Sequence, residues 1–193
     1  MLIRKIRLYY RIVTSRLRGL ALSLYLRCCS CPVGRGLKCK SWPLFRQPPD
    51  ANIFIGNKVN IGWRITLDVY PGAKLVIHDQ VNLTQDVVIS VTEVVEIGQE
   101  TLIAEHVSIR DADHGFHSDR SIASQDLKCS TVNIGSDVWI GSGARILRGS
   151  QVKNGCVIAA NAVVTRHTVF EDYSIYGGVP AKKIKNRNKS VFI

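Results

Sequence analysis

A large aliphatic residue occupies every sixth position between residues 134 and 164. Three shorter runs earlier in the chain repeat this step, each in its own register. A period of six fits neither the period of an α-helix nor the two-residue alternation of hairpin strands. It is typical of a parallel β-helix, in which each hexad supplies a short strand and a turn. The positions are Ile55, Ile61 and Leu67; Ile77, Leu83 and Ile89; Ile97, Ile103 and Ile109; and Ile134, Ile140, Ile146, Val152, Ile158 and Val164.

Three hexads close one triangular coil, so these positions predict about five coils with the aliphatic side chains inside. A β-sandwich of short strands is the alternative architecture. A sandwich requires period-two alternation and turn signals roughly every 8–12 residues. The unbroken hexads from residue 134 to 164 argue against it.

Residues 2–27 show helical spacing instead, with apolar residues at steps of three or four. Arg4, Arg11 and Arg18 follow a step of seven, so they share a flank away from the apolar stripe. The pattern predicts a basic amphipathic helix. The stripe consists of Leu2, Ile6, Tyr9, Val13, Leu17, Leu20 and Leu24.

Helix-breaking residues run from Cys31-Pro32 to Pro48-Pro49 and predict a linker. We therefore divide the chain into a basic segment with its linker, residues 1–46, and a hexapeptide domain, residues 47–193. We also expect a short helix near the C-terminus.

Charge is concentrated at the N-terminal end of the chain. Residues 1–46 hold eleven Lys or Arg and no Asp or Glu, whereas the remainder holds 15 of each sign. Such a block attracts an anionic surface. We expect residues 2–27 to contact a membrane surface; packing on the domain or a partner subunit is the alternative. Nucleic acid is disfavoured, because no binding motif accompanies the charge.

The apolar run from Gly19 to Leu26 is too short and too late for a signal peptide, and no stretch approaches the length of a membrane span. We expect a cytoplasmic protein, with peripheral association at the inner face of the membrane. Of the six cysteines, Cys28, Cys29, Cys31 and Cys39 are crowded together in a spacing that matches neither a zinc ribbon nor a C-x-x-C motif. Reduced thiols are expected, with lipidation or a metal as alternatives. Cys156 occupies a small inward position and is expected in the core.

The hexad rhythm stops after Ile109 and resumes at Val132 or Ile134. The intervening loop, residues 110–131, is polar and long, and such loops are often functional. Within it, His114 is a candidate general base, because a neutral imidazole accepts a proton well near pH 7. Asp113 or Asp111 could orient its ring.

Two stretches resemble the hexapeptide-repeat acyltransferases, namely VNIGSDVWIGSGARILRGSQVKNGCVIAANAVVT and IYGGVPAKKIK. The resemblance covers about residues 52–187. It implies a left-handed parallel β-helix, a homotrimer with active sites between neighbouring prisms, and acetyl-CoA as co-substrate without a metal. The segment IRDADHGFH resembles the active-site sequence of the family, whose histidine falls on His114.

The resemblance also implies site residues. Gly141, Ser142 and Ala160 would lie against the arm of CoA, although Ala159-Ala160-Asn161 departs from the glycine and serine that the family often has. Thr165 and Arg166 would lie near the cofactor, and Lys182 and Lys185 would meet its phosphates. His117 and Trp139 are candidate contacts of the acceptor.

These features predict an acetyl-CoA-dependent O-acetyltransferase that acts on a sugar hydroxyl of a surface polysaccharide or its lipid-linked precursor. An acetyltransferase for a small soluble acceptor, such as serine, a maltose-like sugar or an aminosugar, is the first alternative. A non-catalytic, membrane-associated β-helix scaffold is the second.

Overall fold

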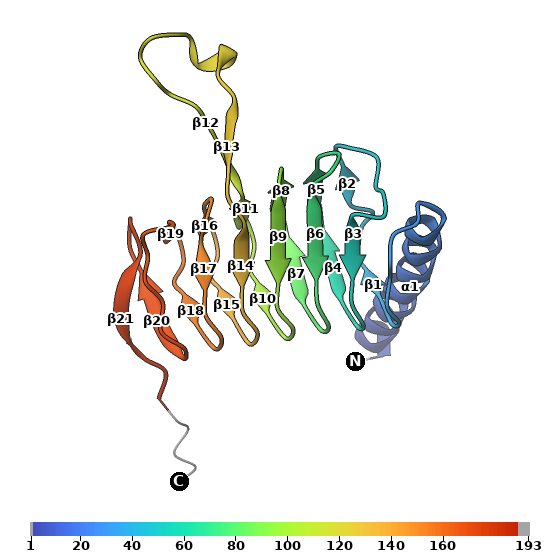
Figure 1. The fold of residues 1–193 in the computed structure, drawn as a ribbon. Coiled ribbons are helices and arrows are strands. Elements are labelled where there is room, and N and C mark those ends of the chain that lie inside the picture. Colours follow the sequence, from blue (N-terminus) through green and yellow to red (C-terminus); the bar gives the residue numbers. More distant parts are fainter. Residues whose placement is uncertain (1, 189–193) are drawn as a thin grey trace.

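The computed structural model describes residues 2–188, without the side chains at positions 2, 5, 6 and 8. A long helix, α1 (Leu2–Cys28), precedes a prism of stacked coils, and a hairpin projects from one edge of the prism (Figure 1). Each of the central coils contributes one strand to each of three faces, and neighbouring coils pair in parallel. The predicted parallel β-helix is therefore confirmed.

The three faces are named here in chain order. The first face contains β1 (Lys38–Cys39), β4 (Asn60–Trp63), β7 (Asn82–Gln85), β10 (Leu102–Ile103), β15 (Trp139–Ile140), β18 (Val157–Ile158) and β20 (Ser174–Gly177). The second face contains β2 (Leu44–Phe45), β5 (Thr66–Val69), β8 (Val88–Val91), β11 (Ser108–Arg110), β16 (Arg145–Ile146) and β19 (Val163–Val164). The third face contains β3 (Ile53–Ile55), β6 (Lys74–Ile77), β9 (Val94–Ile97), β14 (Val132–Ile134) and β17 (Gln151–Val152).

The predicted hexad positions fill the prism. Every one of these aliphatic side chains is at most 3% exposed, so the core is a continuous column of Ile, Leu and Val. Cys156, expected in the core, is fully buried. Because apolar burial drives folding, this column supplies most of the stability of the prism.

The prism has about six coils rather than the predicted five. The additional coil comes from residues interpreted as a linker: β1 pairs with β4, β2 pairs with β5, and Val33 bridges to Ile55. Its inward positions, Val33, Cys39 and Phe45, keep the six-residue step. The linker interpretation was wrong because Cys and Phe replace Ile or Leu there, among prolines and glycines.

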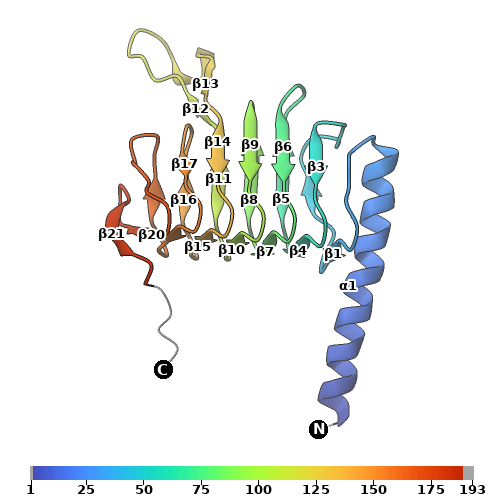
Figure 2. The same cartoon turned by 60° about the horizontal axis from the view of Figure 1, so that its bottom comes forward.

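Helix α1 has two apolar sides. Leu22 and Leu26 are buried against the first coil, and Arg18 Nη1 donates to Lys40 O at 2.8 Å. The predicted stripe is on another side, with Leu17, Leu20 and Leu24 more than half exposed, and Leu20 and Leu24 line a pocket beside residues 34–38 of the first coil. Its members Leu2 and Ile6 lie outside the described side chains. The N-terminal half of α1 extends beyond the prism (Figure 2). No helix in residues 2–188 is long and apolar enough to cross a membrane.

The predicted C-terminal helix was wrong within the described residues. Residues 182–186 form β21 (Lys182–Asn186), which pairs antiparallel with β20. The last coil leaves the backbone of β20 open on one side, and a strand satisfies those groups where a helix could not. The turn contains Gly178 at φ +96°, a conformation that ends a helix.

Candidate active site

The loop expected at residues 110–131 is largely a β-hairpin. β12 (Ala112–His114) pairs antiparallel with β13 (Leu127–Cys129), and a single 3₁₀ turn (Ile122–Ser124) lies near the tip. It leaves the prism between β11 and β14, at the edge between the second and third faces (Figure 1). We call it the active-site hairpin.

His114 lies at the end of β12, opposite Leu127, and its side chain is exposed. The hairpin carries exposed apolar side chains beyond it: Phe116 is 74% exposed and Ile122 is 57% exposed. A projecting hairpin with an apolar tip suits contact with a neighbouring surface.

Asp111, a candidate orienter of His114, is fully buried. Its carboxylate accepts the backbone N–H groups of Thr92 at 2.8 Å and Glu93 at 2.7 Å. These groups belong to the turn of the preceding coil, so Asp111 holds the base of the hairpin to that turn. Its removal would leave two backbone donors without a partner.

Asp113, the other candidate orienter, pairs with Arg148. Arg148 Nε donates to Asp113 Oδ2 at 2.8 Å, and the Arg148 side chain is only 14% exposed. No local sequence pattern indicates Arg148 as a partner, because it lies 35 positions away in the next coil. The described structure thus gives both carboxylates partners other than His114, and the orienting role stays a prediction.

His117 and the hairpin tip are organised by side chains that the sequence analysis missed. The amide of Gln125, which is 7% exposed, accepts the His117 N–H at 2.8 Å and donates to its carbonyl at 2.9 Å. The Lys128 ammonium lies 3.2 Å from His117 Nε2. Because an ammonium can only donate, that ring nitrogen accepts in this arrangement. A buried glutamine among polar residues is the signal that could have indicated this ordered tip.

The predicted CoA contacts lie along two edges of the prism. Gly141, Ser142 and Ala160 occupy stacked positions at the edge between the first and second faces, where Asn161 N donates to Ser142 O at 2.8 Å. Thr165 and Arg166 follow β19, at the edge that also carries the active-site hairpin. One chain therefore does not bring both sets together at one edge.

Close stacking of the coils by itself requires glycine at position 141. A Cβ there would lie 2.7 Å from Ala160 N. Beside it, the carboxylate of Glu105 accepts bonds from its own backbone N–H and from the Ser142 hydroxyl, which together hold its pKa below the ordinary range. This edge thus combines closely stacked backbone with an ionised carboxylate.

Trp139, Lys182 and Lys185 lie on or beside the first face. Trp139 is 54% exposed, and its backbone pairs with Leu102 and Val157 in the neighbouring coils. Lys182 and Lys185 are exposed on β21. Trp139, Lys182 and Lys185 therefore lie away from the edge that carries His114, which is the edge between the second and third faces.

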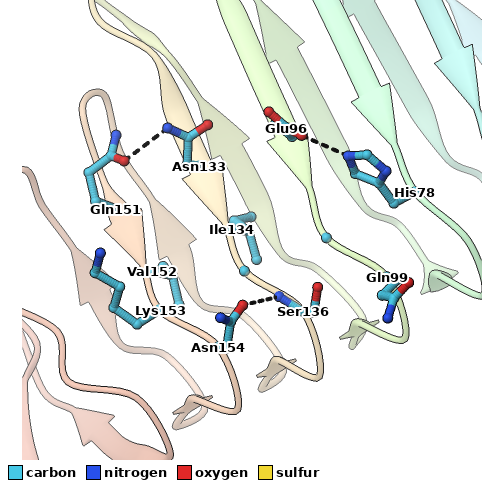
Figure 3. A pocket seen from close by; sticks show the side chains of 12 residues that line it. His78, Glu96, Gln99, Asn133, Ile134, Ser136, Gln151, Val152, Lys153 and Asn154 are labelled. Atoms are coloured by element: carbon cyan, nitrogen blue, oxygen red, sulfur yellow. Dashed lines mark hydrogen bonds and ion pairs between the residues drawn. The ribbon is translucent and has the colours of Figure 1, made fainter.

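A polar groove on the third face holds none of these residues (Figure 3). Its side chains bond with one another along the stack: His78 Nε2 lies 2.7 Å from Glu96 Oε1, and Asn133 Nδ2 donates to Gln151 Oε1 at 2.9 Å. The His78 side chain thus bonds to a side chain of the neighbouring coil, which is consistent with a structural role.

All six cysteines are free thiols. Burial raises the pKa of the Cys31 and Cys39 thiols to about 11, whereas the Cys28 side chain is exposed. The described residues contain no group of three or more His, Cys, Asp or Glu side chains arranged to hold a metal ion.

Comparisons with known proteins agree with this architecture. The sequence model of the family described as bacterial transferase hexapeptide (six repeats) matches residues 131–166. A putative lipopolysaccharide biosynthesis O-acetyl transferase of Escherichia coli is 36% identical over 147 residues, covering 72% of this chain and 74% of that protein. A probable acetyltransferase of Mycobacterium tuberculosis is 36% identical over 159 residues, or 82% of this chain. The chain spans only 50% of the length of this mycobacterial relative.

Solved structures share the fold. A mutant of AntD, an N-acyltransferase from Bacillus cereus in complex with dTDP and coenzyme A, superposes with a TM-score of 0.69 at 22% identity, covering 82% of this chain and 84% of that one. A galactoside acetyltransferase in complex with coenzyme A gives a TM-score of 0.56 at 22% identity, covering 91% of this chain and 82% of that one. The stacked hexads, the matched repeat and the Escherichia coli relative lead to one assignment: the chain belongs to the bacterial hexapeptide-repeat transferase family.

Proposed function

We propose that this protein is an acetyl-CoA-dependent O-acetyltransferase that acts on a sugar hydroxyl of a surface polysaccharide or its lipid-linked precursor. The observation that carries the proposal is His114, presented with an exposed ring on a hairpin that interrupts a transferase β-helix. The Escherichia coli relative, named for lipopolysaccharide O-acetylation, supports a glycan acceptor.

His114 accepts the proton of the sugar hydroxyl as the hydroxyl oxygen attacks the thioester carbonyl. The tetrahedral intermediate carries negative charge on the former carbonyl oxygen, and a backbone N–H just after Trp139-Ile140-Gly141 stabilises it. Because the Gly141 N–H already donates to Ile158 O at 2.8 Å, the next N–H, that of Ser142, is the donor we favour. Collapse of the intermediate breaks the C–S bond, and the imidazolium returns the proton to the thiolate of CoA.

The site is shared between subunits of a homotrimer. His114, Thr165 and Arg166 lie along one edge of the prism, whereas Ser142, Ala160 and Trp139 lie along another edge and its adjoining face. A neighbouring prism would bring the second set opposite the first, with the apolar tip of the hairpin at the contact. Closed rotational symmetry makes three equivalent sites of this kind.

The exposed stripe of α1 contacts a membrane surface. Its leucines Leu17, Leu20 and Leu24 are more than half exposed, and Arg16 and Arg27 lie beside Leu20 and Leu24. An amphipathic helix with this distribution binds at the interface of an anionic bilayer. The arrangement would hold the enzyme beside lipid-linked glycans, at the inner face of a cytoplasmic membrane.

The test is the release of CoA from acetyl-CoA by His114→Ala with a purified glycan acceptor. Loss of the general base is expected to lower kcat by about 10²- to 10⁴-fold, with little change in assembly by light scattering. His117→Asn is the matched control, since it changes a neighbouring imidazole and is expected to affect KM for the acceptor more than kcat. Wild-type turnover by His114→Ala would refute the proposal.

A small soluble acceptor is the competing substrate class. It predicts full activity on free sugars or serine and no dependence on vesicles. A scaffold without catalysis predicts no binding of acetyl-CoA by calorimetry. Activity only toward glycan acceptors would exclude both.

A further inference from the structure

A groove lies between the middle of α1 and the first face of the prism. It has a volume of about 690 Å³ and is lined by α1 residues from Tyr10 to Arg18 and by the first three strands of the face, as far as Asn82. We call it the helix groove. Its volume lies within the usual range of small-molecule sites.

The helix groove is strongly cationic. Arg11, Arg18, Lys38 and Lys40 line it, and no Asp or Glu lies among its lining residues. Within residues 2–188, none of these four cations forms an ion pair. Four cations around one cavity without a carboxylate create a site that favours an anion.

The groove also contains aromatic and amide side chains, which a simple inorganic ion would not contact. Tyr10 is 66% exposed and Trp63 is 38% exposed, so two aromatic rings stand beside the cations. Asn60 Nδ2 donates to Asn82 Oδ1 at 2.5 Å, which leaves further amide positions for ligand hydroxyls. Aromatic surface, amides and cations together suit a ligand with ring faces, hydroxyls and negative charge.

Beyond the groove, the row of outward side chains continues along the first face to Trp139. Along the first face, Lys38 pairs with Asn60, Asn60 with Asn82, Asn82 with Leu102 and Leu102 with Trp139. Since paired strands lie about 4.8 Å apart, this outward row spans roughly 19 Å. An extended chain of a few sugar units could therefore lie along one face, with its charged part in the helix groove and another part at Trp139.

The groove is separate from the surface proposed to contact the membrane. Leu20 and Leu24 of the exposed stripe line a different pocket, with residues 34–38 of the first coil, whereas the α1 residues of the helix groove run from Tyr10 to Arg18. Lys38 is the one described residue that lines both pockets, so the stripe and the helix groove occupy different flanks of α1.

From these observations we infer that the helix groove binds an anionic segment of the glycan acceptor. The inference rests on the proposed function and specifies the chemistry of its acceptor: a saccharide chain that carries phosphate or carboxylate groups. The groove would anchor the chain at a distance from the acetylated hydroxyl.

The test is a binding titration of the full-length protein with phosphorylated dextran oligosaccharides, beside unmodified dextran of the same length and inorganic pyrophosphate. The phosphorylated oligosaccharide is expected to bind most tightly. Arg11→Gln and Lys38→Gln are each expected to weaken its binding by about tenfold. Trp63→Ala is expected to weaken it while leaving pyrophosphate unaffected.

Two matched variants test whether the effect belongs to the groove. Arg16→Gln removes the same charge from α1, and Lys74→Gln removes the same charge from the third face; neither residue lines the groove. If these controls weakened binding of the phosphorylated oligosaccharide equally, the cause would be the overall charge of the protein rather than the groove, and the inference would be overturned. Pyrophosphate binding as tightly as the oligosaccharide would also overturn it.

The outcome is separable from that of the proposed function. His114→Ala is expected to bind the phosphorylated oligosaccharide like the wild type, because His114 lies outside the groove. A titration with phosphatidylglycerol vesicles completes the test. If Arg11→Gln and Lys38→Gln weakened vesicle binding but not oligosaccharide binding, the groove would be a lipid site and the inference wrong, whatever the activity of His114.

Discussion

At the scale of single residues, the two aspartates before His114 have different interactions. Asp111 is buried and accepts two backbone N–H groups, whereas the side chain of Asp113 is 44% exposed and pairs with Arg148. We expect Asp111→Ala to destabilise the protein by about 2 kcal/mol or more, because each orphaned buried donor costs about 1–3 kcal/mol. Thermal unfolding measures this loss.

Asp113→Asn is the companion variant, expected to lower the unfolding midpoint less than Asp111→Ala does, since asparagine keeps an oxygen that can accept the bond from Arg148. If Asp113 orients His114, its substitution lowers kcat without changing KM for acetyl-CoA. The prediction fails if Asp111→Ala melts like the wild type.

The sequence indicates His114 as a candidate base, but it does not distinguish the roles of Asp111 and Asp113. The role of Asp111 depends on Thr92 and Glu93, which are neighbours only through coil stacking. The same holds for Arg148, which comes from the next coil. Side-chain type can be read from the sequence, whereas partners supplied by another coil require the register between coils.

At the scale of elements, α1 offers a comparison within one helix. Leu22 and Leu26 are buried on one side, whereas Leu20 and Leu24 are 60% and 56% exposed on the other. We expect Leu22→Ala or Leu26→Ala to cost about 2–5 kcal/mol of stability, as buried leucines do elsewhere. Leu20→Ala and Leu24→Ala are expected to leave stability within about 0.5 kcal/mol.

Vesicle binding is expected to show the reverse pattern. Leu20→Ala with Leu24→Ala removes apolar surface from the proposed membrane face, so affinity for phosphatidylglycerol vesicles should fall at unchanged unfolding temperature. Unaltered vesicle binding by this double variant would leave the stripe without its proposed partner.

The elements also show which parts of the fold the six-residue period predicts and which it does not. The inward residues of the regular coils could be assigned individually, because a fixed step of six follows directly from the coil geometry. The first coil keeps this step at Val33, Cys39 and Phe45, but its residue types resemble those of a linker. The C-terminal hairpin was missed for another reason: β21 forms because β20 has an open edge, which no local pattern reveals.

At the scale of the whole molecule, the separation of His114 from Ala160 predicts that a complete active site requires two subunits. The two residues lie along different edges of one prism, so a site between neighbouring prisms takes one from each chain. His114→Ala and Ala160→Trp would then inactivate complementary halves. In mixed trimers formed from equal amounts of the two, about one interface in four would be intact on both sides.

We therefore expect co-refolded His114→Ala and Ala160→Trp proteins to recover up to about a quarter of wild-type turnover, although each alone is inactive. The control mixture pairs His114→Ala with Arg166→Glu. These two positions share the edge that carries the active-site hairpin, so no interface in the mixture is intact and no activity should return. Recovery in neither mixture, with trimers present by light scattering, would place the site within a single chain. The exposed apolar tip of the hairpin would then require a different partner, because burying it against a neighbouring prism is what links its projection to catalysis.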